Sequence, residues 1–152
     1  MIRHVPMRMS FLNDGLPAKE HKDCPIQQGK RRMLKGQTAL IVEAQYLIAL
    51  DIQATLEDLS SPRVLIAQDP AFIEELAVPF SEIGLAIVEI ERNLPSNLQL
   101  IGDLVRQGIP VIGVTADQDL RKSINWLSGV PLLFKPTPSE SMIDAIRTVI
   151  VA

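Results

Sequence analysis

Short solid runs of hydrophobic residues alternate with longer stretches of helical spacing from residue 38 to the end of the chain. The solid runs predict strands of a parallel sheet that is covered on both faces, because such strands are buried throughout. Five runs of this kind occur, at 39–42, 63–67, 85–90, 111–114 and 132–134. After each run, apolar spacing or turn signals indicate a helix, at 46–59, 69–78, 94–107, 117–127 and 139–149.

The alternation of strands with helices predicts an α/β fold. Each strand–helix pair has the length of a βα unit, and right-handed crossovers place helices on both faces of one sheet. We expect a doubly wound, flavodoxin-like, five-stranded parallel sheet with strand order 2-1-3-4-5. In this order the first and third strands are neighbours, so Glu43 and Glu89 should face each other at the carboxyl edge.

Turn residues set the expected helix boundaries. Asp69 is expected to cap a helix that has Pro70 in its first turn and runs to about Val78. The segment from Thr115 to Gln118 fits a capping box for the next-to-last helix.

Charge is unevenly distributed along the 152 residues. Residues 1–36 hold eight Lys or Arg against three acidic residues, a net charge of +5, and residues 37–152 hold seven against fifteen, a net charge of −8. No aromatic residues interleave with the bases as they do in single-strand binders. We expect a basic, poorly ordered extension over 1–36 and one domain over 37–152. Binding of nucleic acid or a small ligand through the extension is the alternative from another functional class.

Composition excludes several other classes of protein. No apolar stretch approaches the roughly 18 residues that cross a bilayer, and the N-terminus lacks the apolar core of a signal peptide. The one cysteine, Cys24, and the two histidines, His4 and His21, form no disulfide, metal or catalytic pattern. We expect a cytoplasmic protein without a membrane partner.

Polar side chains end four of the predicted strands, at the edge where an open parallel sheet binds ligands. They are the carboxylates of Glu43 and Glu89, the hydroxyl of Thr115 and the ammonium of Lys135. Each has a plain structural explanation: Glu43 favours a helix N-terminus, Thr115 caps a helix and Lys135 is solvated. Taken together in sheet order, they predict one shared pocket.

The order of these groups resembles a response-regulator receiver domain (CheY-like) of two-component signalling, over about three quarters of the chain. Leu40-Ile-Val-Glu43 resembles the family's first strand with its acidic pair, and Ile87-Val-Glu89 resembles the strand that carries the phosphorylated aspartate. Val114-Thr-Ala116 resembles the hydroxyl-bearing strand, and Lys135-Pro136 resembles the family's lysine followed by proline. The resemblance implies phosphorelay signal transduction and no enzymatic activity beyond self-phosphorylation.

Two departures from the family pattern concern the phospho-acceptor site. The acidic pair reads Glu43-Ala44, and Glu89 stands at the acceptor position in place of aspartate. In the family, Mg²⁺ is held by an acid of the pair, the acceptor carboxylate and the backbone carbonyl two residues later, here that of Glu91. Glutamate moves its carboxylate outward by roughly 1.5 Å, whereas Mg²⁺ geometry and in-line transfer tolerate little displacement. The resemblance therefore implies impaired Mg²⁺ binding, impaired phosphorylation and no other cofactor.

Three interpretations of Glu89 stay open. It can hold the site in a phosphorylated-like arrangement through a charge-assisted bond with Lys135 and a hydroxyl bond with Thr115. It can form a purely structural ion pair. The site can also keep residual Mg²⁺-dependent phospho-acceptor activity, at Glu89 or at a neighbour such as Glu91.

The resemblance also implies partners. A histidine kinase, a phosphotransferase or another regulator would dock on the face built from 117–127, 132–134 and 139–149, or a homodimer would form there. Leu132 stands where the family has a switching aromatic residue, so we expect weak coupling between pocket and face. Trp126 either packs half-buried or anchors a partner. We expect a stand-alone, atypical receiver whose output comes from its partner.

Overall fold

Five strands form one parallel sheet in the predicted order, β2-β1-β3-β4-β5. The computed structural model describes residues 37–59, 63–123 and 129–151. The strands are β1 (Thr38–Val42), β2 (Arg63–Ala67), β3 (Ile83–Glu89), β4 (Val111–Thr115) and β5 (Leu132–Phe134). In the register of the sheet, Val42 pairs with Val88 and Glu89 pairs with Val114, so the strands end together at one edge.

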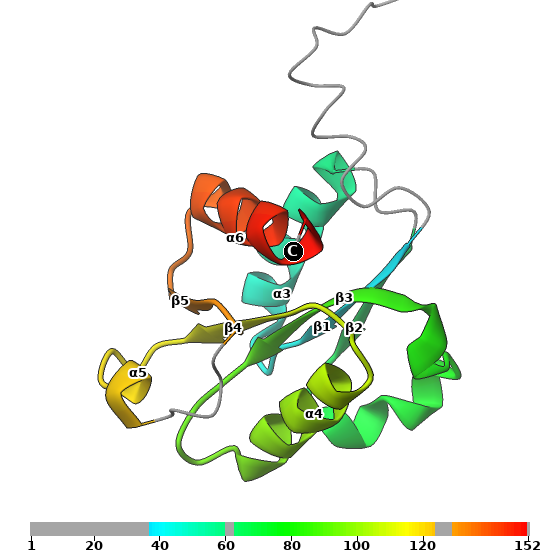
Figure 1. Ribbon diagram of the computed structural model, residues 1–152, viewed down its shortest axis with the longest axis horizontal. Coiled ribbons are helices and arrows are strands. Elements are labelled where there is room, and N and C mark those ends of the chain that lie inside the picture. Colours follow the sequence, from blue (N-terminus) through cyan, green and yellow to red (C-terminus); the bar gives the residue numbers. More distant parts are fainter. Residues whose placement is uncertain (1–36, 60–62, 124–128, 152) are drawn as a thin grey trace, which may run out of the picture.

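Helices cover both faces of this sheet, which gives three layers (Figure 1). The helices α3 (Tyr46–Asp58) and α6 (Ser139–Val151) lie on one face. The helix α4 (Pro95–Arg106) lies on the other, together with the described part of α5 (Leu120–Ser123). The predicted α/β fold is confirmed, and four of the five predicted helices are present among the described residues, although the predicted end of the helix at 117–127 lies outside them.

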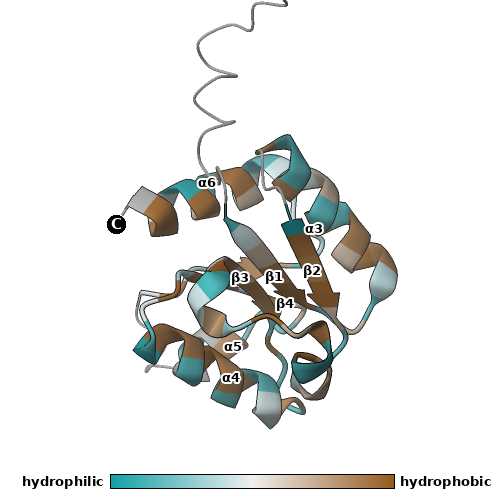
Figure 2. Cartoon of the chain, turned by 90° about the vertical axis from the view of Figure 1, so that its right-hand side faces the viewer, coloured by the Kyte–Doolittle hydropathy of each residue, from teal (hydrophilic) through white to brown (hydrophobic). Residues whose placement is uncertain are grey.

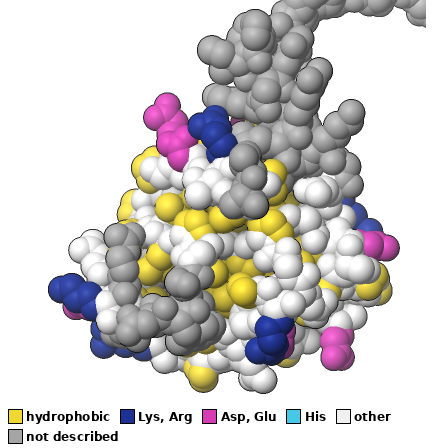
Figure 3. All heavy atoms as spheres, in the orientation of Figure 1, with side chains coloured by type: hydrophobic (Ala, Val, Ile, Leu, Met, Phe, Trp, Pro, Cys, Tyr) yellow, Lys and Arg dark blue, Asp and Glu magenta, His cyan; other side chains and the backbone are white. Residues whose placement is uncertain are grey.

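The solid hydrophobic runs are explained by two cores, one on each face of the sheet. Successive strand residues point to opposite faces, so Leu40 and Val88 pack toward α4 whereas Ile41 and Ile87 pack toward α3 and α6. The strands are accordingly mostly hydrophobic, with polar residues only near their ends, while the helices combine hydrophobic and hydrophilic stretches (Figure 2). On the face shown in Figure 3, hydrophobic side chains gather in the middle and charged ones lie around the margin.

Gly113 in the middle of β4 is required by close packing. A Cβ atom at this position would lie 2.4 Å from Ile90 Cδ1 and 3.2 Å from Leu132 Cδ1. The first distance is far below a van der Waals contact, and both neighbours belong to or pack against the α4-side core. The glycine therefore lets two large aliphatic side chains meet over β4.

The predicted helix from Asp69 to Val78 is wrong. Asp69 does cap the segment, since its Oδ1 accepts the N–H of Ala71 at 2.7 Å, but the chain forms 3₁₀ turns at Pro70–Phe72, Glu74–Leu76 and Phe80–Glu82. Ala77 ends the second turn with a positive φ of 53°. The segment between the flanking prolines is too short to offset helix nucleation, and 3₁₀ turns also place residues three apart on one side.

The predicted helix at 117–127 begins later than expected. Thr115 Oγ1 accepts the N–H of Asp117 at 3.0 Å, and Asp117 Oδ1 accepts the N–H of Asp119 at 2.9 Å. These local bonds hold the chain in turns up to Leu120, so the predicted capping box at Thr115 is wrong.

Several predictions concern residues outside the described part of the chain. They include the ordering of residues 1–36, with Cys24, His4 and His21, and the placement of Trp126. The division of the chain at residue 36 therefore stays a prediction. Within residues 37–59, 63–123 and 129–151, no helix is long and apolar enough to cross a membrane.

Candidate functional site

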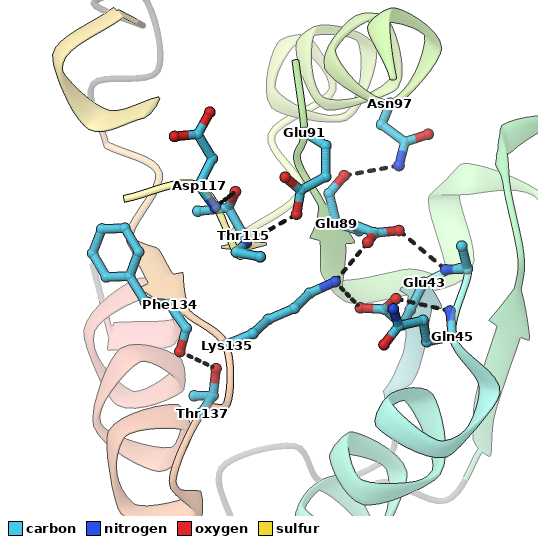
Figure 4. Close-up of polar contacts among 12 residues, drawn as sticks. Glu43, Gln45, Glu89, Glu91, Asn97, Thr115, Asp117, Phe134, Lys135 and Thr137 are labelled. Carbon is cyan, nitrogen blue, oxygen red and sulfur yellow. Dashed lines mark hydrogen bonds and ion pairs between the residues drawn. The ribbon is translucent and has the colours of Figure 1, made fainter. Parts of the chain in front are cut away.

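The ammonium of Lys135 lies between the two carboxylates that follow β1 and end β3 (Figure 4). Its Nζ is 2.8 Å from Glu43 Oε1 and 2.5 Å from Glu89 Oε2. The side chains of Lys135, Glu43 and Glu89 are only 10%, 2% and 7% exposed. We call these three residues the ion triad.

The sheet register explains why the ion triad forms. Val42 pairs with Val88, so the next residues, Glu43 and Glu89, stand side by side at the carboxyl edge, as predicted. Lys135 directly follows β5, and its long side chain reaches back across the edge to both carboxylates (Figure 4). Three residues from distant parts of the sequence are thus brought to one point by strand order alone.

Backbone N–H groups satisfy the remaining carboxylate oxygens. Glu89 Oε1 accepts the N–H of Ala44 at 3.1 Å, and Glu43 Oε2 accepts the N–H of Gln45 at 2.9 Å. Both donors belong to the turn between β1 and α3. Glu43 therefore bonds to the residue before α3 and to Lys135, but it lies outside the first turn of the helix and does not cap it.

Burial and charge shift two pKa values in the ion triad. Burial raises the pKa of the Glu43 carboxyl above 4.5, against the lowering effects of the Lys135 hydrogen bond and the Gln45 N–H. Burial alone would lower the pKa of Lys135, but the bonds and charges of Glu43 and Glu89 raise it above 10.5. Lys135 therefore keeps its charge at neutral pH, held by two acids.

Asn97 on α4 holds the backbone of Glu89 by a hydrogen bond. It is not among the site residues that the sequence predicts. Its Nδ2 donates to the backbone carbonyl of Glu89 at 2.8 Å, and the side chain is buried. A sequence signal existed, because Asn97 interrupts the apolar stripe that continues with Leu100, Ile101 and Leu104. A buried amide in such a stripe needs a polar partner.

Thr115 belongs to the same edge but does not join the ion triad. Its side chain is fully buried, and its hydroxyl accepts the N–H of Asp117. Among the described residues, no hydrogen bond joins Thr115 to Glu89. The hydroxyl bond expected for a phosphorylated-like arrangement is therefore not formed.

Glu91 fixes the neighbouring loop with both its side chain and its backbone. Glu91 Oε1 accepts the N–H of Ala116 at 2.9 Å, which ties the loop after β3 to the loop after β4 (Figure 4). The carbonyl of Glu91, which the resemblance assigned to Mg²⁺, accepts the N–H of Leu94 at 3.0 Å.

The donor set at this edge does not fit a divalent cation as it is built. Mg²⁺ requires near-octahedral oxygen ligands, but the facing oxygens of Glu43 and Glu89 both contact the Lys135 ammonium. Position 44 is alanine and supplies an N–H to Glu89 instead of a carboxylate. In the described part of the chain, no three Cys, His, Asp or Glu side chains are grouped to hold a metal ion.

A cavity of about 570 Å³ opens beside the ion triad. Its polar lining includes Asp51 from α3, Glu91 and Lys135, and its apolar lining includes Ile48 and Pro136. The predicted switch residue Leu132 lies elsewhere, half-buried against the α4-side core.

Comparisons with known proteins agree with this fold. No family model and no curated protein matches the sequence. Among solved structures, the PhyR stress response regulator is 26% identical with a TM-score of 0.61, over 82% of this chain and 49% of that one. The signal receiver domain of an HD domain-containing protein from Pseudomonas fluorescens Pf-5 is 24% identical with a TM-score of 0.63, over 77% and 96%. The REC domain of Erythrobacter litoralis PhyR is 19% identical with a TM-score of 0.62, over 77% and 92%.

The chain therefore has the fold of response-regulator receiver domains, and the resemblance expected from the sequence is confirmed at that level.

Proposed function

We propose that this protein is an atypical receiver in response-regulator signalling that acts by binding other proteins, with phosphoryl transfer at Glu89 impaired. One observation carries the proposal: the Lys135 ammonium joins Glu43 and Glu89 at the place where a receiver would assemble its metal and phosphoryl group. The similarity to receiver structures supports the signalling role.

The charges at the site support the proposal that phosphoryl transfer is impaired. Phosphoryl transfer depends on positioning and on neutralising the phosphoryl charge with a metal ion. Here Lys135 already neutralises the carboxylates, and Ala44 leaves no second acid beside Glu43. A divalent cation would have to displace a buried ammonium held by two ion pairs, which is costly because it would leave that ammonium without partners.

Of the interpretations left open by the sequence, a structural ion triad has the most support. A phosphorylated-like arrangement would need the Thr115 hydroxyl at Glu89, whereas this hydroxyl is engaged with Asp117. Each Glu89 side-chain oxygen already has a donor, Ala44 or Lys135. The site is therefore not expected to change its state by phosphorylation. In this proposal, signalling depends on which partner protein is bound.

The partner in this proposal is a histidine kinase, a phosphotransferase or another regulator. The receiver fold shared with regulators such as PhyR supports this choice. The protein would act through surface recognition and would need no cofactor. A homodimer over α5, β5 and α6, the face that the sequence resemblance implies, belongs to the same proposal.

The proposal is tested by labelling with radioactive acetyl phosphate and Mg²⁺. We expect no acid-stable, Mg²⁺-dependent label on the wild-type protein under conditions that label an ordinary receiver. The double variant Ala44→Asp, Glu89→Asp serves as the matched gain-of-function protein and should become labelled. Stoichiometric label on the wild type at Glu89 or Glu91 would overturn the proposal, and failure of the double variant would overturn the assignment of the site.

A further inference from the structure

The cavity beside the ion triad has more acid than base in its lining. Asp51, Glu89 and Glu91 line it, and Lys135 is the one base among its lining residues. The charge of Lys135 is already shared by Glu43 and Glu89. Asp51 and Glu91 line the cavity and have no ion-pair partner among the described residues.

This excess of acidic lining residues favours a positively charged ligand over an anion. An anion such as a phosphoryl group would meet uncompensated carboxylates, and the one ammonium that could receive it is already held by two acids. A cation would instead gain charge-assisted hydrogen bonds to Asp51 and Glu91. The free oxygen of Glu91 is available for this, since only Oε1 is used by the Ala116 N–H.

The walls of the cavity favour a long amphipathic cation over a bare ion. Ile48 and Ile52 of α3, Val114 of β4 and Pro136 form its apolar lining. Such a surface suits the methylene stem of an arginine or lysine side chain, which buries its carbons and keeps its charged end among polar groups.

The outer face of α3, next to the cavity, is apolar and exposed. Tyr46, Leu47 and Leu50 are 58%, 80% and 37% exposed. They lie in the same two helical turns as Ile48 and Asp51, which line the cavity. Exposed large hydrophobic residues beside a charged cavity indicate a protein interface more than a site for a free metabolite.

We propose that the cavity and the outer face of α3 bind a segment of a partner protein, with one arginine or lysine side chain entering beside Asp51 and Glu91 and apolar neighbours covering Leu47 and Leu50. This rests on the proposed function, because it names the chemistry of the partner that a receiver without phosphoryl transfer recognises. The side chain that enters the cavity is a cation, so binding of the partner does not depend on phosphorylation.

The cation subsite is tested with Nα-acetyl-arginine amide as the probe, followed by amide NMR shifts. We expect saturable shifts at Asn93, Ala116 and Thr137 with a dissociation constant on the order of 1 mM, as suits a ligand of this size. Nα-acetyl-citrulline amide has the same shape without the charge and should bind at least tenfold more weakly. Equal binding of the two compounds, or no saturable shift, would overturn the inference.

Variants locate the subsite. Asp51→Asn with Glu91→Gln should weaken arginine binding at least tenfold, while glutamine still accepts the Ala116 N–H and keeps the loop in place. Asp144→Asn, an exposed acid on α6, is the matched control and should bind as the wild type does. Unchanged binding by the double variant would show that arginine binds elsewhere and would overturn the inference.

The apolar part is tested with two blocked tripeptides, Leu-Arg-Leu and Ser-Arg-Ser. The leucine peptide should bind several-fold more tightly, and Leu47→Gln should remove that advantage. Equal binding of both peptides to the wild type would overturn the assignment of a protein segment. These outcomes are separable from the proposed function, since only Mg²⁺-dependent labelling tests phosphoryl transfer.

Discussion

The Lys135 ammonium lies 2.5 Å from Glu89 Oε2, although the two residues are 46 positions apart in the sequence. The bond crosses the carboxyl edge of the sheet from the end of β5 to the end of β3. It places a positive charge between two buried carboxylates that would otherwise repel each other. The same ammonium occupies the carboxylate oxygens of Glu43 and Glu89 that a metal ion would need as ligands.

Removing the Lys135 charge should destabilise the fold strongly. Lys135→Met keeps most of the aliphatic stem but leaves Glu43 and Glu89 facing each other without a cation. Removal of one partner from a buried ion pair costs about 3–5 kcal/mol. We expect the free energy of unfolding at pH 7, measured by urea denaturation, to fall by about 3 kcal/mol.

Lys122→Met is the matched control for this experiment. Lys122 is exposed on α5, and its loss should change the free energy of unfolding by no more than about 0.5 kcal/mol. If Lys135→Met proved as stable as Lys122→Met, the ion triad would contribute nothing to the fold.

The raised pKa of Glu43 gives a pH dependence of known sign. Because the folded protein binds this proton more tightly than the unfolded chain, the associated stability is fully present below pH 4.5 and is lost as pH rises through the raised pKa. Glu43→Gln removes this titration. The stability of the wild type relative to Glu43→Gln should therefore fall across that window in urea denaturation at successive pH values. A relative stability that rises with pH would mean that Lys135 outweighs burial.

Asn97 should prove to be a positioning residue for Glu89. Asn97→Asp is nearly isosteric but turns the donor to the Glu89 carbonyl into an oxygen. An unsatisfied buried group costs about 1–3 kcal/mol, so we expect at least about 2 kcal/mol of destabilisation at pH 7. A protonated aspartic acid can donate again, so part of the loss should be recovered near pH 4. A loss that does not depend on pH would show that Asn97 acts by packing alone.

Gly113 should be intolerant of a side chain. Gly113→Ala forces Ile90 or Leu132 out of place, and overpacking of this kind costs about 1–3 kcal/mol. Gly102→Ala on α4 is the control, since its Cβ would lie 3.7 Å from Arg106 and a helical alanine is favoured by about 0.5–1 kcal/mol. Thermal unfolding of both variants checks the prediction, and equal melting temperatures would contradict the packing described for β4.

The part of the site predicted from sequence is the part that strand order determines. Glu43, Glu89 and Lys135 each end or follow a solid hydrophobic run, and parallel strands bring such positions to one edge. The five strands and their order follow from the same runs. These features depend on periodicity and topology, which a single sequence carries directly.

The features that were missed depend on local competition or on side-chain packing. The segment after Asp69 has helical spacing, but 3₁₀ turns satisfy the same spacing over a short stretch. The Thr115 hydroxyl could bond to Glu89 or to Asp117, and only the loop geometry decides between them. Asn97 interrupts the apolar stripe of its helix, which marks it as a buried polar residue, but its partner is a backbone carbonyl that the sequence does not identify.

The most direct test of the central claim is a Mg²⁺ titration, with and without beryllofluoride, followed by amide NMR shifts. Because Lys135 occupies the space between Glu43 and Glu89, we predict no saturable response at Ala44, Glu89 or Thr115, whereas the variant Ala44→Asp, Glu89→Asp should respond. A saturable response of the wild type at these amides would contradict the claim and show a working phosphorylation site.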